Sequence, residues 1–105
     1  MQNSYKLKFT PAANDDLDII YQYISEYLVA QKAADDLMDD IETSIMRLKD
    51  FPYSGNPVTD DILSSRGYRK LIVKNYIVFH LIDEAGKQVV IMRVLYGAQQ
   101  YENLL

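Results

Sequence analysis

Cysteine is absent from this chain of 105 residues, which excludes disulfide bonds, thiolate metal sites and a cysteine nucleophile. Long apolar runs are absent too, because none approaches the roughly 18 residues that a membrane span requires. Residues 1–9 lack the apolar core and the small-residue cleavage site of a secretion signal. We therefore expect a cytoplasmic protein that does not enter membranes and that folds by side-chain packing alone.

The common signatures of catalysis and of cofactor binding are also missing. The sequence has no glycine-rich phosphate loop, no serine nucleophile elbow and no His-Glu-x-x-His pattern. One acidic cluster invites comparison with a metal site, but nothing in its pattern fixes the ligand geometry, so we interpret it as a solvated helix face. Its members are Asp35, Asp36, Asp39, Asp40 and Glu42. We expect neither a cofactor nor a bound metal.

Positive charge is scarce, and it is unevenly distributed. The net charge is −4, and the first fifty residues hold five Lys or Arg against ten Asp or Glu, whereas the remainder holds six against five. Proteins bind nucleic acids nonspecifically by neutralising phosphates with Lys and Arg. Any contact of this chain with nucleic acid must therefore be local, or must depend on a larger assembly.

The first half of the sequence predicts a strand followed by two helices. Residues 5–9 alternate apolar and polar side chains, which is typical of a half-buried strand. Thr10 followed by Pro11 predicts the beginning of a helix. Its apolar stripe comprises Leu17, Ile20, Ile24, Tyr27 and Leu28. A second stripe, from Ala34 to Leu48, is out of phase with the first, so the helix must break within residues 29–32.

The second half predicts a loop and three strands. Residues 51–65 are rich in Pro, Gly and Ser, and three runs of β-branched and aromatic residues follow at 67–73, 76–82 and 88–96. At 49% apolar content, residues 1–105 are expected to form one domain. The predicted class is α+β, with an N-terminal strand, a helical hairpin and a three-stranded antiparallel meander. The hairpin should pack on one face of the meander, with Leu17, Ile24, Leu37, Ile41, Val90 and Val94 in the core.

Basic residues within the strands are the main candidates for a functional site. Arg93 stands in an otherwise apolar strand, where a cation is costly unless it faces a groove or a partner. We expect it to serve function; the alternative is an arginine that snorkels at the sheet edge or pairs with an acid. A further four basic residues lie within nine positions and suffice to contact a few phosphates or an acidic partner, unless they are ordinary solvated charges. They are Arg66, Arg69, Lys70 and Lys74.

The histidine and two of the tyrosines complete the candidate residues. His80, the only histidine, lies within a predicted strand and suits a half-buried structural role better than that of a general base. Tyr21, Tyr23 and Tyr27 follow helical spacing and are interpreted as packing residues. Tyr96 and Tyr101 lie at the end of the last strand and beyond it, where side chains more often meet ligands.

Three segments together resemble one family of bacterial proteins. LKDFPYSGNP, RGYRKLIVKNYIVFHLID and VVIMRVLYGAQQYENLL are similar to the second half of RelE/ParE toxins, and the predicted order of elements agrees. The resemblance implies the toxin of a type II toxin-antitoxin system, associated with plasmid stabilization and growth inhibition. It implies a cognate antitoxin as partner, and either DNA gyrase or ribosome-bound mRNA as target. A homodimer is a further expectation.

The same resemblance suggests roles for individual residues. In ribosome-dependent members, matching positions stabilise the scissile phosphate and handle protons; here they are Arg69, Arg93 and Tyr101. Arg66, Lys70, Lys74 and Tyr96 would bind the target or the antitoxin. The chain has Tyr96 where those members often carry a histidine, and Ala98 and Gln99 where an arginine follows.

These departures, the acidic charge and the long helical hairpin favour the ParE branch, which poisons DNA gyrase. The alternatives are a RelE-like mRNA endoribonuclease, a degenerate module that only binds antitoxin or DNA, and an unrelated interaction domain with the same fold.

Overall fold

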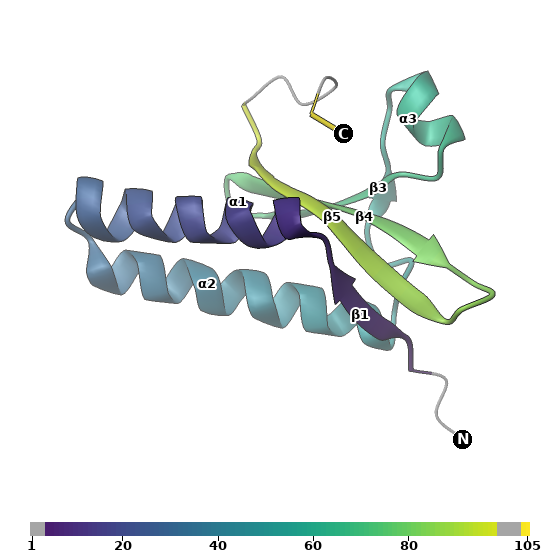
Figure 1. The fold of residues 1–105 in the computed structure, drawn as a ribbon, viewed down its shortest axis with the longest axis horizontal. Coiled ribbons are helices and arrows are strands. Elements are labelled where there is room, and N and C mark those ends of the chain that lie inside the picture. The colour runs from purple at the N-terminus through teal and green to yellow at the C-terminus, as the bar shows by residue number, and fades with distance from the viewer. Residues whose placement is uncertain (1–3, 99–103) are drawn as a thin grey trace.

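The computed structural model, which describes residues 4–98 and 104–105, contains two antiparallel helices packed against a five-stranded sheet (Figure 1). The elements are β1 (Lys6–Phe9), α1 (Pro11–Gln22), a π-helical turn (Tyr23–Tyr27), α2 (Gln31–Met46), a 3-10 turn (Arg47–Lys49), β2 (Asn56–Pro57), α3 (Asp61–Ser65), β3 (Arg69–Val73), β4 (Tyr76–Asp83) and β5 (Gln88–Tyr96). The predicted α+β class is confirmed. No described helix is long and apolar enough to cross a membrane.

Helix α1 begins where the sequence predicted. The Thr10 hydroxyl accepts a hydrogen bond from the backbone N–H of Ala13 (3.0 Å), and Pro11 occupies the first helical position. This side chain satisfies one of the amide groups that a helix start leaves without partners. The same hydroxyl donates to the carbonyl of Met92 on β5 (2.8 Å), so the helix cap also fixes α1 against the sheet.

The predicted break between the helices is confirmed, and it is sharp. After α1 the chain widens into the π-helical turn, and Val29 then adopts a φ of 51°. This left-handed conformation is unfavourable for a β-branched residue. The side chains of Tyr27, Leu28 and Val29 are exposed at this tip. Assigning Tyr27 and Leu28 to the buried stripe was therefore wrong, because the π-helical turn rotates them out of the phase of α1.

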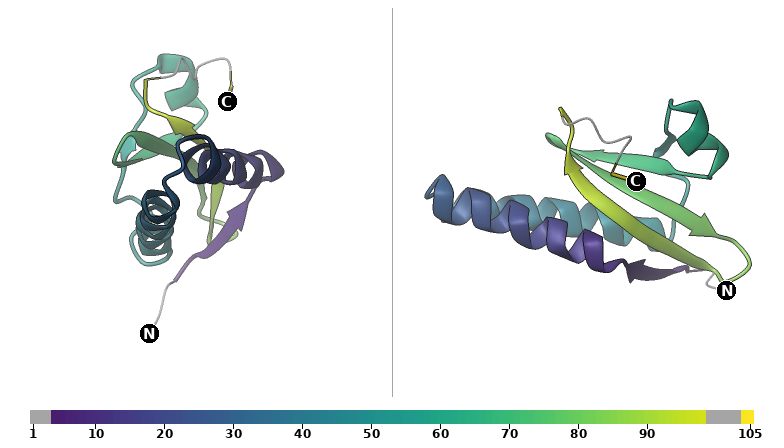
Figure 2. Two further views of the ribbon diagram at one scale, coloured as in Figure 1. Left: turned by 90° about the vertical axis from the view of Figure 1, so that its left-hand side faces the viewer. Right: turned by 45° about the horizontal axis from the view of Figure 1, so that its top comes forward.

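The predicted meander is confirmed, and the sheet extends beyond it. Its strand order is β1-β5-β4-β3-β2, and β1 pairs with β5 in parallel while the other neighbours are antiparallel. The segment predicted as a loop contains β2 and α3; the carboxylate of Asp60 caps α3 by accepting from the amide of Leu63 (3.0 Å). Figure 2 shows α1 and α2 on one side of the sheet and α3 projecting away from them.

Buried side chains form two clusters, one on each face of the sheet. The cluster under the helices includes Leu37, Ile41 and Val94, with Leu17 and Ile24 partly buried against it, as the sequence predicted. The second cluster packs on the face that α3 covers, around Phe79 and Leu95. Val90 belongs to neither cluster, and its assignment to the core was wrong, because Val89 and Ile91 face the helices instead.

A β-bulge in β5 changes which side chains share a face. His80 pairs with Ile91 and Phe79 pairs with Arg93, so Met92 is an extra residue in the ladder. Strict alternation would place Arg93 on the same face as Ile91. The bulge moves Arg93 to the face of Phe79 and Leu95, opposite to the face of Ile91.

Candidate functional site

The arginine of β5 forms an ion pair with an acid of α1. Asp16 accepts hydrogen bonds from Nε of Arg93 (2.7 Å) and from its second terminal nitrogen (2.8 Å), and from the backbone N–H of Val94 (2.9 Å). The Asp16 side chain is 9% exposed and that of Arg93 23%. These hydrogen bonds raise the pKa of Arg93. Arg93 therefore pairs with an acid, which was the alternative to a purely functional role.

Arg93 also holds the end of the chain. Its remaining terminal nitrogen donates to the carbonyl of Leu104 (2.9 Å), and Leu105 packs against the cluster around Phe79. The guanidinium therefore joins α1, β5 and the C-terminal residues. This gives Arg93 a structural role, which a groove-lining cation would not have. Whether it also contacts a target stays a prediction.

Arg69 points to the face of the sheet opposite to that of Arg93. It shares one face of β3 with Leu71 and Val73, which pack toward the helices. One guanidinium nitrogen donates to the carbonyls of Tyr53 (3.1 Å) and Gly55 (2.9 Å), and the guanidinium carbon lies 5.1 Å from the centre of the Tyr53 ring. The Phe-Pro-x-x-Gly loop therefore holds this cation with its backbone.

His80 is buried beside Arg69. The two residues are cross-strand neighbours on β4 and β3, and His80 is 0% exposed, so the expectation of a half-buried side chain was wrong in degree. The pKa of His80 is lowered to about 4, mainly by burial and to a smaller extent by the charge of Arg69, while the backbone carbonyl of Pro52 acts to raise it. Neither ring nitrogen has a hydrogen bond of normal geometry within the described residues. A neutral, enclosed imidazole suits a structural role and not that of a base.

Gly55 explains why the loop approaches the sheet so closely. A Cβ at this position would overlap the backbone carbonyl of Lys70 and would touch the ring of His80. Only glycine therefore allows the loop to deliver its carbonyl oxygen to Arg69.

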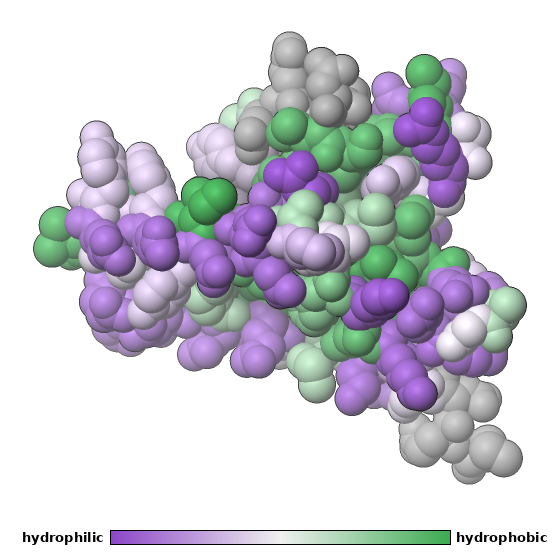
Figure 3. Space-filling model, viewed as in Figure 1, coloured by the Kyte–Doolittle hydropathy of each residue, from purple (hydrophilic) through white to green (hydrophobic). Residues whose placement is uncertain are grey.

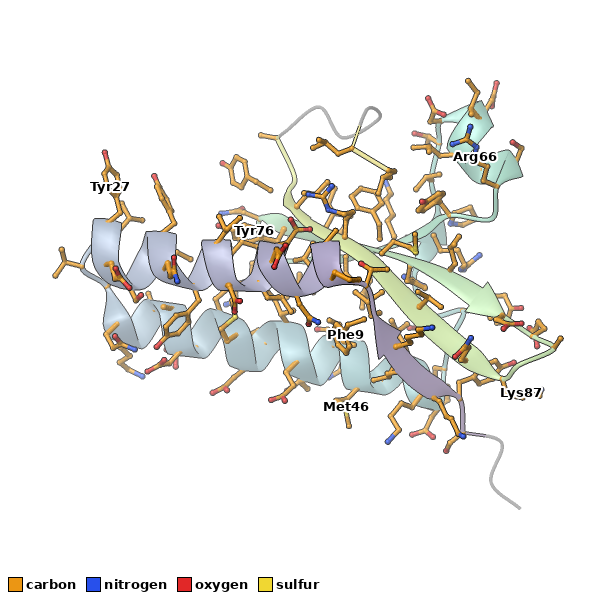
Figure 4. All side chains as sticks on the ribbon, in the orientation of Figure 1. Phe9, Tyr27, Met46, Arg66, Tyr76 and Lys87 are labelled. Carbon is orange, nitrogen blue, oxygen red and sulfur yellow. The ribbon has the colours of Figure 1, made fainter. Side chains whose placement is uncertain are left out.

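The candidate residues that the structure describes do not converge on one site. Arg69 and Arg93 face opposite sides of the sheet, and each is held by other groups. Tyr101 lies outside the described residues. Arg66 follows α3, where Figure 4 labels it, and it is exposed. Lys70 points to the face of the sheet opposite to Arg69, which is the side that carries α3. Of the three predicted catalytic residues, the two that the structure describes, Arg69 and Arg93, are therefore not brought together.

Two candidates lie instead near the helices. The ammonium group of Lys74 pairs with the Asp40 carboxylate of α2 (3.2 Å). Tyr96 is half exposed and packs edge-on against Tyr76, with their ring centres 5.7 Å apart. Burial raises the pKa of Tyr76, and the neighbouring Tyr96 contributes to the shift.

Sequence reasoning missed two features. Asp16 was not among the candidate residues, because its partner Arg93 lies 77 positions away in the sequence. Exposed aromatic and aliphatic side chains on α1 and the following turn were also missed, since their spacing resembles that of a buried stripe. Ile19, Tyr23 and Tyr27 are 64%, 50% and 75% exposed, and Tyr23 and Tyr27 stack at 5.2 Å between ring centres.

An apolar groove lies between β1 and the helices. It has a volume of about 320 Å³ and is lined by side chains of β1, α1 and α2: Leu7, Phe9, Leu17, Met38, Asp39, Ile41, Glu42, Ile45 and Met46. Figure 4 shows Phe9 at the end of β1 above Met46 at the end of α2. Sequence patterns did not reveal the groove, because three separate elements supply its walls.

The acidic cluster behaves as a solvated helix face. Asp36 pairs with Lys32 (3.2 Å), and Asp35 accepts from the hydroxyl of Tyr21 (2.9 Å). Figure 3 shows hydrophilic side chains along both helices. Within residues 4–98 and 104–105, no three His, Cys, Asp or Glu side chains are placed to hold a metal ion.

Several solved structures share this fold. The chain is similar to the chromosomal ParDE system of P. aeruginosa, with a TM-score of 0.73 and 23% identity over 90% of this chain and 98% of the other. It is similar to the RelBE2 toxin-antitoxin complex of Mycobacterium tuberculosis (TM-score 0.63, 22% identity, 89% and 98%). It is also similar to the YoeB/ParE toxin of Agrobacterium tumefaciens (0.61, 16%, 87% and 96%). At these identities the likeness concerns the fold.

Sequence comparison identifies the family. No curated protein matches the chain. The model of the ParE toxin of the type II toxin-antitoxin system parDE matches residues 7–101, which is most of the sequence. The chain therefore belongs to the ParE toxin family of type II toxin-antitoxin systems.

Proposed function

We propose that this toxin acts by binding DNA gyrase and not by cleaving RNA. The observation that carries the proposal is the separation of Arg69 and Arg93 on opposite faces of the sheet, each with its guanidinium already bound. Cleavage of a phosphodiester requires charge-stabilising and proton-transferring groups that converge on one phosphate. Binding requires only a complementary surface.

The histidine supports the same proposal. His80 is the one imidazole of the chain, and it is fully buried with its pKa lowered to about 4. A general base works best when its pKa lies near the operating pH and when it reaches the proton it removes. His80 meets neither condition.

The test is a supercoiling assay with purified gyrase. We expect the chain to inhibit supercoiling and to accumulate cleaved DNA complexes. Unchanged supercoiling together with codon-dependent cuts in ribosome-bound mRNA would contradict the proposal and support the RelE-like alternative. Tyr96, Arg66, Lys70 and Lys74 remain the proposed contact residues, because Tyr96 and Arg66 are exposed and Lys74 pairs only at the surface.

We also propose that a cognate antitoxin neutralises the chain in the cytoplasm. The likeness to the ParDE system and to the RelBE2 toxin-antitoxin complex supports this partner. Induction of the chain alone should arrest bacterial growth, and co-expression of the protein encoded by the adjacent reading frame should restore it. Soluble expression without arrest would support the degenerate binding module instead.

A further inference from the structure

The groove between β1 and the helices is open and largely apolar. Phe9 and Leu17 supply part of one side and Met38 and Met46 part of the other, and the side chain of Met46 is 47% exposed. When a partner removes the large apolar side chains of a concave surface from water, the free energy of the complex is lowered. The groove therefore favours the binding of apolar side chains.

Two carboxylates border this groove, and they differ from the other acids of α2. Asp35 accepts hydrogen bonds from Tyr21, Asp36 pairs with Lys32, and Asp40 pairs with Lys74. Asp39 and Glu42 line the groove, are exposed, and have no ion-pair or hydrogen-bond partner among the described residues. The two acids of α2 without partners are thus the two at the groove.

Among residues 4–98 and 104–105, no cation lines the groove. Lys6 and Lys8 alternate on β1 with Leu7 and Phe9, so they point to the other face of the sheet. The helical hairpin as a whole, residues 11–46, carries nine Asp or Glu and one Lys. The negative electrostatic potential of these residues attracts basic partners and disfavours acidic ones.

We propose that the groove binds a segment of the cognate antitoxin that carries apolar side chains flanked by Lys or Arg. The apolar side chains pack against Phe9, Leu17 and Met38, and the flanking cations pair with Asp39 and Glu42. This inference rests on the antitoxin partner proposed above and adds the position and the chemistry of its contact. It requires a basic toxin-binding segment, because the surface of this toxin at the groove is acidic.

Methionine methyl groups provide the test of position. The chain has four methionines, of which Met38 and Met46 line the groove and Met92 lies at the opposite face of the sheet. Overlapping synthetic peptides that cover the antitoxin are titrated into the chain labelled with carbon-13 at its methionine methyl groups. We expect one peptide with apolar and basic residues to shift the signals of Met38 and Met46 and to leave Met92 unchanged. A shift of Met92 alone, or an acidic peptide in the groove, overturns the proposal.

Charge variants test the chemistry. Glu42→Lys should weaken the binding of that peptide about tenfold, whereas Glu26→Lys, the same charge change on the same hairpin outside the groove, should weaken it less than about twofold. Glu42→Gln should fall between them, and added salt should reduce the difference. Equal effects of the two Lys variants overturn the proposal. Growth arrest and gyrase inhibition do not enter these measurements, so their failure leaves the groove assignment intact.

Discussion

Asp16 continues the edge of the sheet where β1 ends. The backbone of β1 pairs with residues 88–91 of β5, Thr10 bonds to Ile91 and Met92, and the Asp16 carboxylate then accepts from the amide of Val94 while holding Arg93. One side chain thus completes the hydrogen bonding of a strand and neutralises a partly buried cation.

We expect Asp16→Ala to lower the free energy of unfolding by about 2 to 4 kcal/mol, because it leaves an amide and a guanidinium without their acceptor. Arg93→Ala should cost about 2 kcal/mol, since the carboxylate it abandons is nearly buried. Urea titration measures both, with the exposed Asp18→Ala as control. A cost below about 0.5 kcal/mol for both would contradict the structural role.

Leu37→Ala should cost about 2 to 5 kcal/mol, because Leu37 is 8% exposed within the cluster under the helices and its truncation leaves a cavity. Ile72→Ala is the matched control, since Ile72 is 62% exposed, and it should cost less than about 1 kcal/mol. Chemical denaturation compares the two. Similar losses would mean that the helices do not pack on the sheet as described.

His80 predicts a loss of stability in mild acid. The unfolded chain takes up a proton near pH 6.5, whereas the folded chain takes it up only near pH 4. Protons therefore favour the unfolded state as pH falls from about 6.5 to 4, and the stability lost in this window amounts to roughly 3 kcal/mol. We expect His80→Gln to remove most of this dependence. Because His80 is the only histidine, NMR of its ring protons gives its pKa directly; a value near 6.5 would contradict the burial.

Two glycines provide a matched pair. Gly55→Ala should cost about 1 to 3 kcal/mol, because its Cβ meets the backbone carbonyl of Lys70, which cannot move alone. Gly86→Ala should cost about 1 kcal/mol or less, because its Cβ meets only the flexible carboxylate of Asp83. Thermal unfolding ranks the two. The reverse order would mean that the loop holding Arg69 is not seated as described.

Tyr96→Ala should leave the free energy of unfolding within about 1 kcal/mol of the parent, because the ring is half exposed. We expect it nevertheless to weaken growth arrest or antitoxin binding, since exposed tyrosines are common binding hot spots. Tyr53→Ala is the comparison variant. Tyr53 is also half exposed, but its side chain contacts Glu84 and Arg69. Full toxicity and full antitoxin affinity of the Tyr96 variant would remove it from the candidate site.

Local patterns predicted the local structure well. The Thr10-Pro11 helix start, the break before α2 and the three meander strands each depend on residues close in sequence, where capping, phase and alternation act directly. The bulge at Met92 was not predictable in the same way, because nothing in a run of apolar residues marks the extra one. Because of the bulge, Arg93 lies on the face opposite to Ile91, and Val90 and Val94 do not share a face as strict alternation predicts.

The candidate site was less predictable for the same reason. Asp16 and Arg93 lie far apart in the sequence, and so do β1 and α2, which form the groove. Their proximity follows from the way the whole sheet assembles. Residue types therefore identified Arg69 and Arg93 as unusual, but could not show that the two face opposite sides or that backbone and carboxylate groups already hold them.

The parallel pairing of β1 with β5 also determines when this toxin is completed during synthesis. Leu7 and Phe9 are synthesised before residues 88–91, with which β1 pairs. β1 therefore stays without its partner strand until those residues have been made, because contacts between distant residues must wait for both partners. The groove that β1 lines takes its native form only after that step.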